Sequence, residues 1–195
     1  RLPEGFGVDV CLAEFYPDTM FHGWDVSPQA IELAKSRPHP RVEIHLADFA
    51  EATETWDLLL AIDVLEHLEN PAAFLRHARE RARFAAIHLP LDLSVQTVLR
   101  GGPLTVRRRS LGHIHMFTSD LARDLLTENG WEILDSTYTG GALELPVADG
   151  LGNLVKNWSL RLPRRILFAL APNLAVRLLG GWSILLLCRT KDPAI

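Results

Sequence analysis

The chain has 195 residues, of which 48% are hydrophobic and 23% are charged, and its formal net charge is −4 at pH 7. These values are typical of one globular domain with a sizeable core, and they exclude a low-complexity or fibrous chain. The net charge gives no reason to expect a nucleic-acid partner, although basic clusters at Arg107–Arg109 and Arg161–Arg165 leave that class of partner weakly open.

The cysteines and the apolar segments indicate in which cellular compartment the protein is expected. Cys11 and Cys188 lie far apart and form no ligand-spacing motif, so we expect free thiols in a reducing, cytoplasmic environment. No signal peptide is visible. The run Ile166–Cys188 is long enough to span a bilayer, but Pro172 and a central arginine oppose insertion, and we expect no span.

Strand-like and helix-like segments alternate through the first ninety residues. We expect strands at Phe6–Cys11, Met20–Asp25, Val42–Asp48, Trp56–Asp63 and Arg83–Leu89. Between them, helices are expected at Ser27–Ser36, where Ser27 is the N-cap, and at Asn70–Arg81, which opens with a similar Asn-Pro pair. Alternation of this kind predicts right-handed crossovers and a mostly parallel sheet.

The second half contains a helix, two strands and a segment of different character between the strands. The helix is expected at Thr118–Asn129, and the strands at Trp131–Thr139 and Trp182–Thr190. Basic residues stand among leucines in residues 160–179, which Pro163 and Pro172 should divide into two short helices. We expect a single domain over residues 1–195, in which residues 140–181, as the family resemblance given below implies, form a helical lid over the substrate. Residues 160–179 are a candidate for peripheral membrane contact.

Acidic residues stand at the ends of the strand candidates, where ligands bind in an open parallel sheet. Asp25, Asp48 and Asp63 end three of them, and Asp9 lies two residues before the end of the first. Asp25 is the most informative, because a carboxylate directly before a capped helix can accept both hydroxyl hydrogens of a ribose. The alternative is a solvated aspartate in a strand-to-helix turn.

Four segments together resemble one family, the class I, Rossmann-like methyltransferases that depend on S-adenosylmethionine. They are Gly23–Lys35 (GWDVSPQAIELAK), Leu46–Phe49 (LADF), Trp56–Pro71 (WDLLLAIDVLEHLENP) and Gly112–Phe117 (GHIHMF). The resemblance covers residues 6–139 and resumes at 182–190. It implies an α/β fold with a mostly parallel seven-stranded sheet, helices on both faces and a helical insertion before the last strand.

The chain departs from the family at the glycine loop. The family has Gly-x-Gly-x-Gly after its first strand, whereas Leu12 follows Cys11 directly. Only the eight residues Leu12–Thr19 separate the first two strand candidates, and a parallel crossover with its helix needs at least about ten to twelve. We therefore expect residues to be missing between Cys11 and Leu12. In an alternative register, Gly5 and Gly7 are the first two glycines.

The resemblance implies a cofactor site and two catalytic histidines. Asp25 would bind the ribose of S-adenosylmethionine, and Asp48 the exocyclic amine of its adenine. The expected cofactor-binding residues are Asp9, Cys11, Asp25, Val26, Asp48, Phe49 and Asp63. His67 and His113 are the expected catalytic residues, because His67 follows the fourth strand, where the substrate pocket of such enzymes opens. The alternative for His67 is a surface histidine satisfied in a loop.

A metal is the alternative to acid–base chemistry at the same place. Asp63, Glu66 and His67 resemble an acidic-x-x-Glu-His pattern of metal-dependent relatives, namely small-molecule O-methyltransferases and RNA 3′-end ribose methyltransferases. His113 or His115 would then be a further ligand of Mg, Mn or Zn. Many relatives with Glu-His here are not known to bind metal, and our prediction assigns none. The histidines without such neighbours receive no role: His22, His39, His45, His77 and His88.

The sequence thus predicts transfer of a methyl group from S-adenosylmethionine to a small organic acceptor, by O- or N-methylation. A partly apolar acceptor suits the leucines of the expected lid. Two alternatives stay open: a non-catalytic methyltransferase-like binding or scaffolding module, and a metal-dependent RNA ribose methyltransferase. A true deletion of the glycine loop would favour the non-catalytic module.

Overall fold

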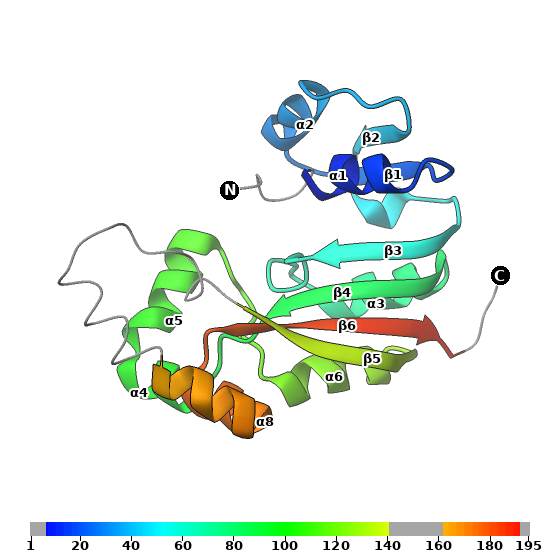
Figure 1. Cartoon of the computed structure of the whole chain (residues 1–195). Helices are drawn as coiled ribbons and strands as arrows, with labels where there is room; N and C mark the ends of the chain where they lie inside the picture. The colour runs from blue at the N-terminus through cyan, green and yellow to red at the C-terminus, as the bar shows by residue number, and fades with distance from the viewer. Residues whose placement is uncertain (1–6, 141–161, 192–195) are drawn as a thin grey trace. The chain divides into compact units, whose positions relative to one another are not determined.

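The computed structural model describes residues 7–140 and 162–191, with side chains from residue 11 onward. The chain divides into two compact units, residues 1–54 and residues 55–195 (Figure 1). Each unit has its own sheet: two strands in the first unit and four in the second.

Unit 1 is a small parallel α/β unit. Its elements are α1 (Gly7–Phe15), β1 (Phe21–Asp25), α2 (Pro28–Lys35), β2 (Val42–Leu46) and the 3₁₀ helix η1 (Phe49–Glu51). β1 and β2 run parallel, with Asp25 opposite Leu46 at their carboxyl ends. Ser27 begins the crossover helix α2 by accepting a hydrogen bond from Ala30 N, as its sequence predicts. Ile31 and Ala34 form the buried face of that helix.

The expected first strand is a helix. Residues 7–15 form α1, and at its end Tyr16 N donates to Leu12 O at 3.0 Å. Cys11 and Leu12 are consecutive residues within this helix, so the prediction of missing residues between them is wrong. The error has a physical source, because a short apolar run has the same composition in a buried strand and in a buried helix.

The helical start at Gly7 changes the interpretation of the glycines. The segment predicted as the first strand is the helix α1, which leads into β1. Residues 12–19 therefore do not have to hold a complete crossover helix between two strands. This agrees with the alternative register, in which Gly5 and Gly7 are the first two glycines; Gly5 itself lies outside the described residues. Asp9 lies in the first turns of α1 and does not end a strand.

Unit 2 contains a four-stranded mixed sheet. Its elements are β3 (Trp56–Ile62), α3 (Pro71–Arg79), β4 (Ala82–Pro90), α4 (Val95–Arg100), α5 (Gly102–Val106), the π-helix η2 (Arg107–Leu111), α6 (Ser119–Glu128), β5 (Trp131–Gly140), α8 (Pro172–Leu179) and β6 (Trp182–Thr190). The strand order is β3-β4-β6-β5. β3 and β4 are parallel, whereas β6 runs antiparallel to both of its neighbours.

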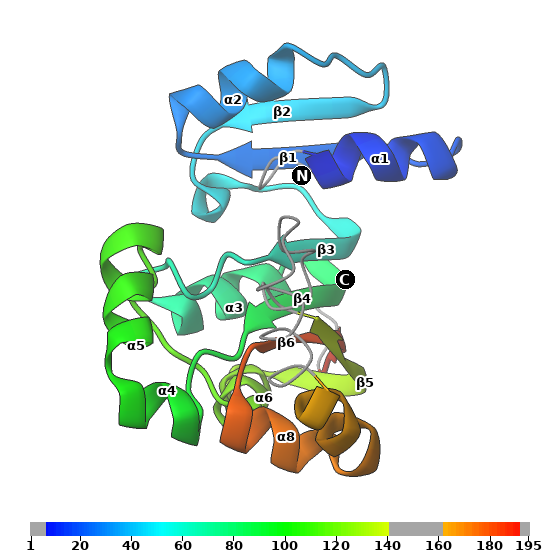
Figure 2. The same cartoon turned by 60° about the vertical axis from the view of Figure 1, so that its left-hand side comes forward.

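One face of this sheet forms the core of unit 2. Alternate residues of β4 and β6 are fully buried, and they include Ile87 and Leu186. α3 and α6 contact the sheet and each other (Figures 1 and 2). Trp131 is fully buried, and its indole Nε1 donates to Leu75 O of α3 at 3.1 Å. Burial of each such side chain stabilises the fold by roughly 1.5–3 kcal/mol.

The α/β architecture is confirmed, but the expected seven-stranded, mostly parallel sheet is not. The described residues contain six strands in two sheets, and two of the four strand pairs are antiparallel. In a doubly wound sheet of order 3-2-1-4-5, the first strand joins the two halves. No such strand occurs within residues 7–140 and 162–191, so β1–β2 and the other four strands form separate sheets.

The end of the expected lid is helical. Residues 162–170 form one helix and α8 forms another, so Pro172 divides the segment as predicted, whereas Pro163 lies inside the first helix. Residues 141–161 lie outside the described part, and the lid as a whole is therefore not tested. Across the described ranges, no helix combines the length and the apolar character that a membrane crossing requires.

Candidate functional site

Two carboxylates stand at the carboxyl edge of the sheet in unit 1. Asp25 ends β1, and its Oδ1 accepts from Ser27 N at 2.7 Å. Asp48 follows β2 by two residues, and its Oδ1 accepts from Ala50 N at 2.9 Å at the start of η1. Because β1 and β2 are parallel, both acidic groups lie beyond the same edge. Each uses one oxygen to fix a turn, and the second oxygen of each is available to a ligand's donors.

The other expected cofactor-binding residues of unit 1 fall into two groups. Val26 is exposed directly after Asp25, and Phe49 is buried with its ring edge-on to Trp24. Both therefore adjoin the carboxylates. Asp9 and Cys11 lie within α1, so the argument from a strand end no longer supports them.

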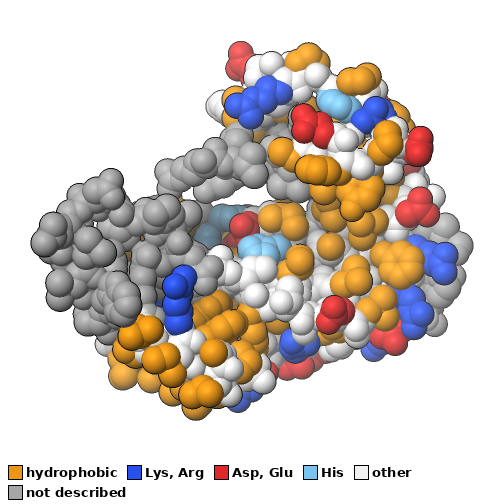
Figure 3. All heavy atoms as spheres, viewed as in Figure 1, with side chains coloured by type: hydrophobic (Ala, Val, Ile, Leu, Met, Phe, Trp, Pro, Cys, Tyr) orange, Lys and Arg blue, Asp and Glu red, His pale blue; other side chains and the backbone are white. Residues whose placement is uncertain are grey.

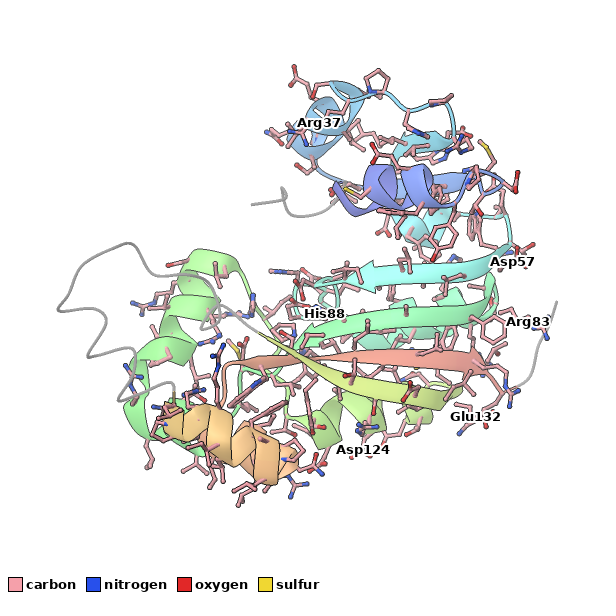
Figure 4. All side chains as sticks on the ribbon, viewed as in Figure 1. Arg37, Asp57, Arg83, His88, Asp124 and Glu132 are labelled. Atoms are coloured by element: carbon pink, nitrogen blue, oxygen red, sulfur yellow. The ribbon has the colours of Figure 1, made fainter. Side chains whose placement is uncertain are left out.

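In unit 2, a polar chain starts at the end of β3. Asp63 is the non-glycine residue with positive φ (53°) among those described; aspartate is one of the residue types that tolerate this conformation. Its Oδ1 lies 2.7 Å from Nδ1 of His88, whose Nε2 lies 2.8 Å from Oγ1 of Thr139. Figure 4 shows His88 toward the end of β4. No role was predicted for His88, because its partner is 25 residues away in sequence.

The turn after β3 buries a glutamate. Leu65 anchors this turn in the core and is fully buried. The backbone oxygen of Glu66 accepts from Ile114 N at 2.8 Å and from His115 N at 3.1 Å. Segment 112–117, which the sequence singled out, therefore lies against the turn that carries His67.

The carboxylate of Glu66 has an unusual environment. The residue is 1% exposed, and neither carboxylate oxygen has a hydrogen-bond partner among the described residues. Burial raises the pKa of Glu66 to about 7, and the nearby carboxylates of Asp63 and Asp92 act in the same direction. The backbone N–H of Glu66 itself acts in the opposite direction on this pKa. A carboxylate buried so deeply is unfavourable when charged, so a bound proton or a nearby cation would stabilise it.

His113 is held by a second carboxylate. Its Nδ1 lies 2.6 Å from Oδ2 of Asp92, and both residues are buried. Asp92 also forms an ion pair with Nε of Arg107, from the π-helix η2. Gly112 ends η2 in the left-handed conformation, with φ 77°, and thereby turns the chain toward His113. Sequence reasoning missed Asp92, whose loop position after β4 carries no motif.

His67 lies beside both Glu66 and His113, and we call these three residues the cluster. Its Nδ1 lies 3.3 Å from the carbonyl oxygen of Gly112, and its ring meets that of His113 edge to face, with centroids 4.9 Å apart. Its Nε2 lies 3.9 Å from Oε1 of Glu66. The structure therefore brings together the two predicted catalytic histidines. His115 stacks on Phe117 instead and is not part of the group.

Comparisons with known proteins give a match to a family model over part of the chain, and a fold. Residues 4–84 match the sequence profile of a family described as a methyltransferase domain. A comparison with curated protein sequences gives no match.

Several solved structures are similar to the chain. A magnesium protoporphyrin IX methyltransferase from Synechocystis with bound SAH is 16% identical, with a TM-score of 0.58 over 95% of this chain and 70% of that one. A cyclopropane synthase from Mycobacterium tuberculosis is 13% identical, with a TM-score of 0.64 over 95% and 75%. A SAM-dependent methyltransferase from Archaeoglobus fulgidus is 13% identical, with a TM-score of 0.61 over 95% and 82%.

At these identities the structural likeness concerns the fold, and the profile match concerns the N-terminal part of the chain. Both agree with the motifs at Gly23–Lys35 and Trp56–Pro71. The chain therefore has the fold of the class I, Rossmann-like methyltransferases, and its residues 4–84 match a methyltransferase domain.

Proposed function

We propose that the protein transfers a methyl group from S-adenosylmethionine to a hydroxyl or amine of a small organic acceptor. The methyltransferase-domain match and the fold support methyl transfer. Similar proteins were solved with SAH or SAM, which supports S-adenosylmethionine as the cofactor.

The observation that carries the proposal is the position of Asp25. It ends β1 immediately before the Ser27-capped helix α2, and its turn hydrogen bond uses only one carboxylate oxygen. This is the location of the ribose-binding carboxylate in dinucleotide folds. Asp48, with Val26 and Phe49 adjacent in sequence to the two acids, would contact the adenine. Asp63 remains a candidate at the end of β3.

His67 and His113 are the proposed groups that act on the acceptor. Methyl transfer from a sulfonium depends mainly on holding the nucleophile in line, and a base helps when the nucleophile is a hydroxyl. His67 is 40% exposed and can reach an acceptor, whereas Asp92 orients the buried His113. Both cysteines are free. Cys188 is not suited to act as a nucleophile, because burial raises the pKa of its thiol to about 12. Free thiols agree with the cytoplasmic location that we propose.

The acceptor is proposed to be partly apolar. The helices at 162–170 and α8 expose large hydrophobic side chains, and Figure 3 shows hydrophobic side chains gathered around α8. They are Ile166, Leu170, Leu174 and Leu178. Such a surface suits either an apolar substrate or peripheral contact with a membrane.

Calorimetric titration of the full chain with S-adenosylhomocysteine tests the proposal. One binding event per chain is expected. Absence of binding would instead favour the non-catalytic module.

A further inference from the structure

We propose that Glu66, His67 and His113 bind a divalent transition-metal ion, most simply Zn²⁺, through one carboxylate oxygen and two imidazole nitrogens. The ligand atoms that these three side chains offer lie within 4.8 Å of one another. The proposal goes beyond methyl transfer, and it can be tested without any methyl acceptor.

The first argument is the buried carboxylate. Glu66 is 1% exposed, and neither of its carboxylate oxygens has a hydrogen-bond partner within the described parts of the chain. Buried polar atoms in folded proteins almost always have a partner, and an absent ion is one of the ordinary explanations for an exception. The nearest cationic candidate is the imidazole of His67, with Nε2 3.9 Å from Oε1. A cation between them would satisfy both side chains.

The second argument is the orientation of the imidazoles. Nδ1 of His113 is bonded to the carboxylate of Asp92 at 2.6 Å, and Nδ1 of His67 faces the carbonyl of Gly112 at 3.3 Å. In each ring Nδ1 is therefore engaged, and Nε2 is left for a bond to a metal ion. Metal-binding histidines almost always donate their other N–H to a carboxylate or a backbone carbonyl, which fixes the tautomer and the ring orientation. Both kinds of support are present here.

The donor set identifies the class of ion. Two histidines and one carboxylate are a known set of three protein ligands for zinc, and they leave a fourth position for water or a substrate. Ligand atoms about 2.0–2.1 Å from a tetrahedral ion lie about 3.4 Å from one another. Nε2 of His67 and Oε1 of Glu66 lie 3.9 Å apart, so binding of an ion requires these two side chains to move closer together.

Asp63 is excluded from this ligand set, although the sequence pattern included it. Its carboxylate is bonded to His88, and it is not in the group of ligand atoms. The proposed site therefore has three protein ligands, of which His67 is the exposed one. An ion there would lower the pKa of a bound hydroxyl acceptor, because the metal stabilises the oxyanion.

A second cluster must be distinguished in the test. His22, Glu43 and His45, on neighbouring strands of unit 1, also offer three ligand atoms within reach of one another. Glu43 lies 3.7 Å from each of the two histidines, and Nε2 of His45 is buried without a hydrogen-bond partner among the described residues. The carboxylate of Glu43 is exposed to water, whereas that of Glu66 is buried, and on this difference we assign the ion to unit 2.

The experiment is calorimetric titration of the chelator-treated full chain with ZnCl₂, followed by Co²⁺ and Mg²⁺. The proposal expects one Zn²⁺ per chain, a visible absorption of nitrogen-coordinated Co²⁺, and no comparable binding of Mg²⁺, which prefers oxygen ligands. His67→Ala and His113→Ala should each weaken Zn²⁺ binding at least tenfold. His115→Ala, two residues from His113 but outside the group, should leave it unchanged.

Two further variants keep the result decisive. Asp92→Asn should weaken Zn²⁺ binding about 10–100-fold, as loss of an orienting partner does. His45→Ala tests the cluster in unit 1. Absence of Zn²⁺ binding in the wild-type chain would overturn the proposal, and so would binding that survives His67→Ala but is lost in His45→Ala. If His113→Ala fails to fold, as judged by circular dichroism, the exposed His67→Ala decides the matter.

Discussion

Oδ1 of Asp63 lies 2.7 Å from Nδ1 of His88, and this contact joins the end of β3 to β4. Asp63 makes it from a backbone conformation with φ 53°, which is unfavourable for most residues. Aspartate thus combines two properties at this position: it tolerates the left-handed conformation, and it supplies an acceptor.

Replacing Asp63 separates these two properties. Asp63→Ala should lower the free energy of unfolding by about 1 kcal/mol, since the pair is partly exposed and alanine is strained at positive φ. Asp63→Asn retains both an acceptor oxygen and tolerance of this conformation, so its loss should be less than half as large. Urea denaturation of the two variants measures the difference. Equal losses would show that the charge, and not the conformation, matters.

The second prediction concerns the ribose-binding role of Asp25. Asp25→Ala should weaken S-adenosylhomocysteine binding by about 1–3 kcal/mol, the usual effect of losing a charged hydrogen-bond partner. Asp25→Asn preserves an acceptor for Ser27 N and hence the turn, but it cannot accept from two hydroxyls equally. Weaker binding in both variants, measured by calorimetry, supports a ligand contact. Unchanged affinity in the asparagine variant would leave Asp25 with only its structural role in the turn.

The third prediction concerns His67. His67→Ala should lower turnover by at least about tenfold, as expected for a group that assists proton transfer or positions the acceptor. Cofactor affinity should stay nearly constant, because His67 is assigned to the acceptor and not to the cofactor. His115→Ala is the matched control, since the side chain of His115 stacks on Phe117 and only its backbone N–H contacts Glu66. Full activity of the His67 variant would make it an ordinary surface histidine.

The fourth prediction follows from the pKa of Glu66, which burial raises from 4.5 to about 7. The folded protein therefore holds this proton more tightly than the unfolded chain. Its stabilising effect is complete below pH 4.5 and is lost as the pH rises to about 7. In the presence of chelator, the loss should amount to about 3 kcal/mol, since each pKa unit is equivalent to about 1.4 kcal/mol.

Glu66→Gln removes this titration. Its free energy of unfolding should fall less between pH 4.5 and 7 than that of the wild type, and urea denaturation at several pH values measures both slopes. Parallel curves for the two proteins would mean that the Glu66 carboxylate titrates normally in the folded chain.

Local signals in the sequence predicted most of the fold. Ser27 was predicted as a helix N-cap and Asn70-Pro71 as a similar helix start, and the side chains of Ser27 and Asn70 each accept a backbone hydrogen bond there. The strand ranges from Phe21 onward agree within a few residues, because strand-forming runs are bounded by clear turn residues. Residues 6–11 were assigned wrongly, since a short apolar run does not distinguish a strand from a helix.

The candidate site was only partly predictable. The strand-end rule identified Asp25, Asp48 and Asp63, because it depends on local order along the chain. The contacts Asp63–His88 and Asp92–His113 join residues 25 and 21 positions apart. Such pairs depend on strand register and loop geometry, which no local pattern encodes. The buried state of Glu66 depends in the same way on segment 112–117 closing over its turn.

The place of β6 has a consequence for how unit 2 folds. β6 follows β4 and β5 along the chain, yet it pairs with β4 on one side and with β5 on the other. During synthesis, β4 and β5 must therefore wait for residues 182–190 before they are joined in one sheet, and the edges that β6 covers stay unpaired until then. Contacts so distant along the chain also slow folding, because a long loop must close before they form. Unit 2 thus gains its cooperative structure only when β6 has been made.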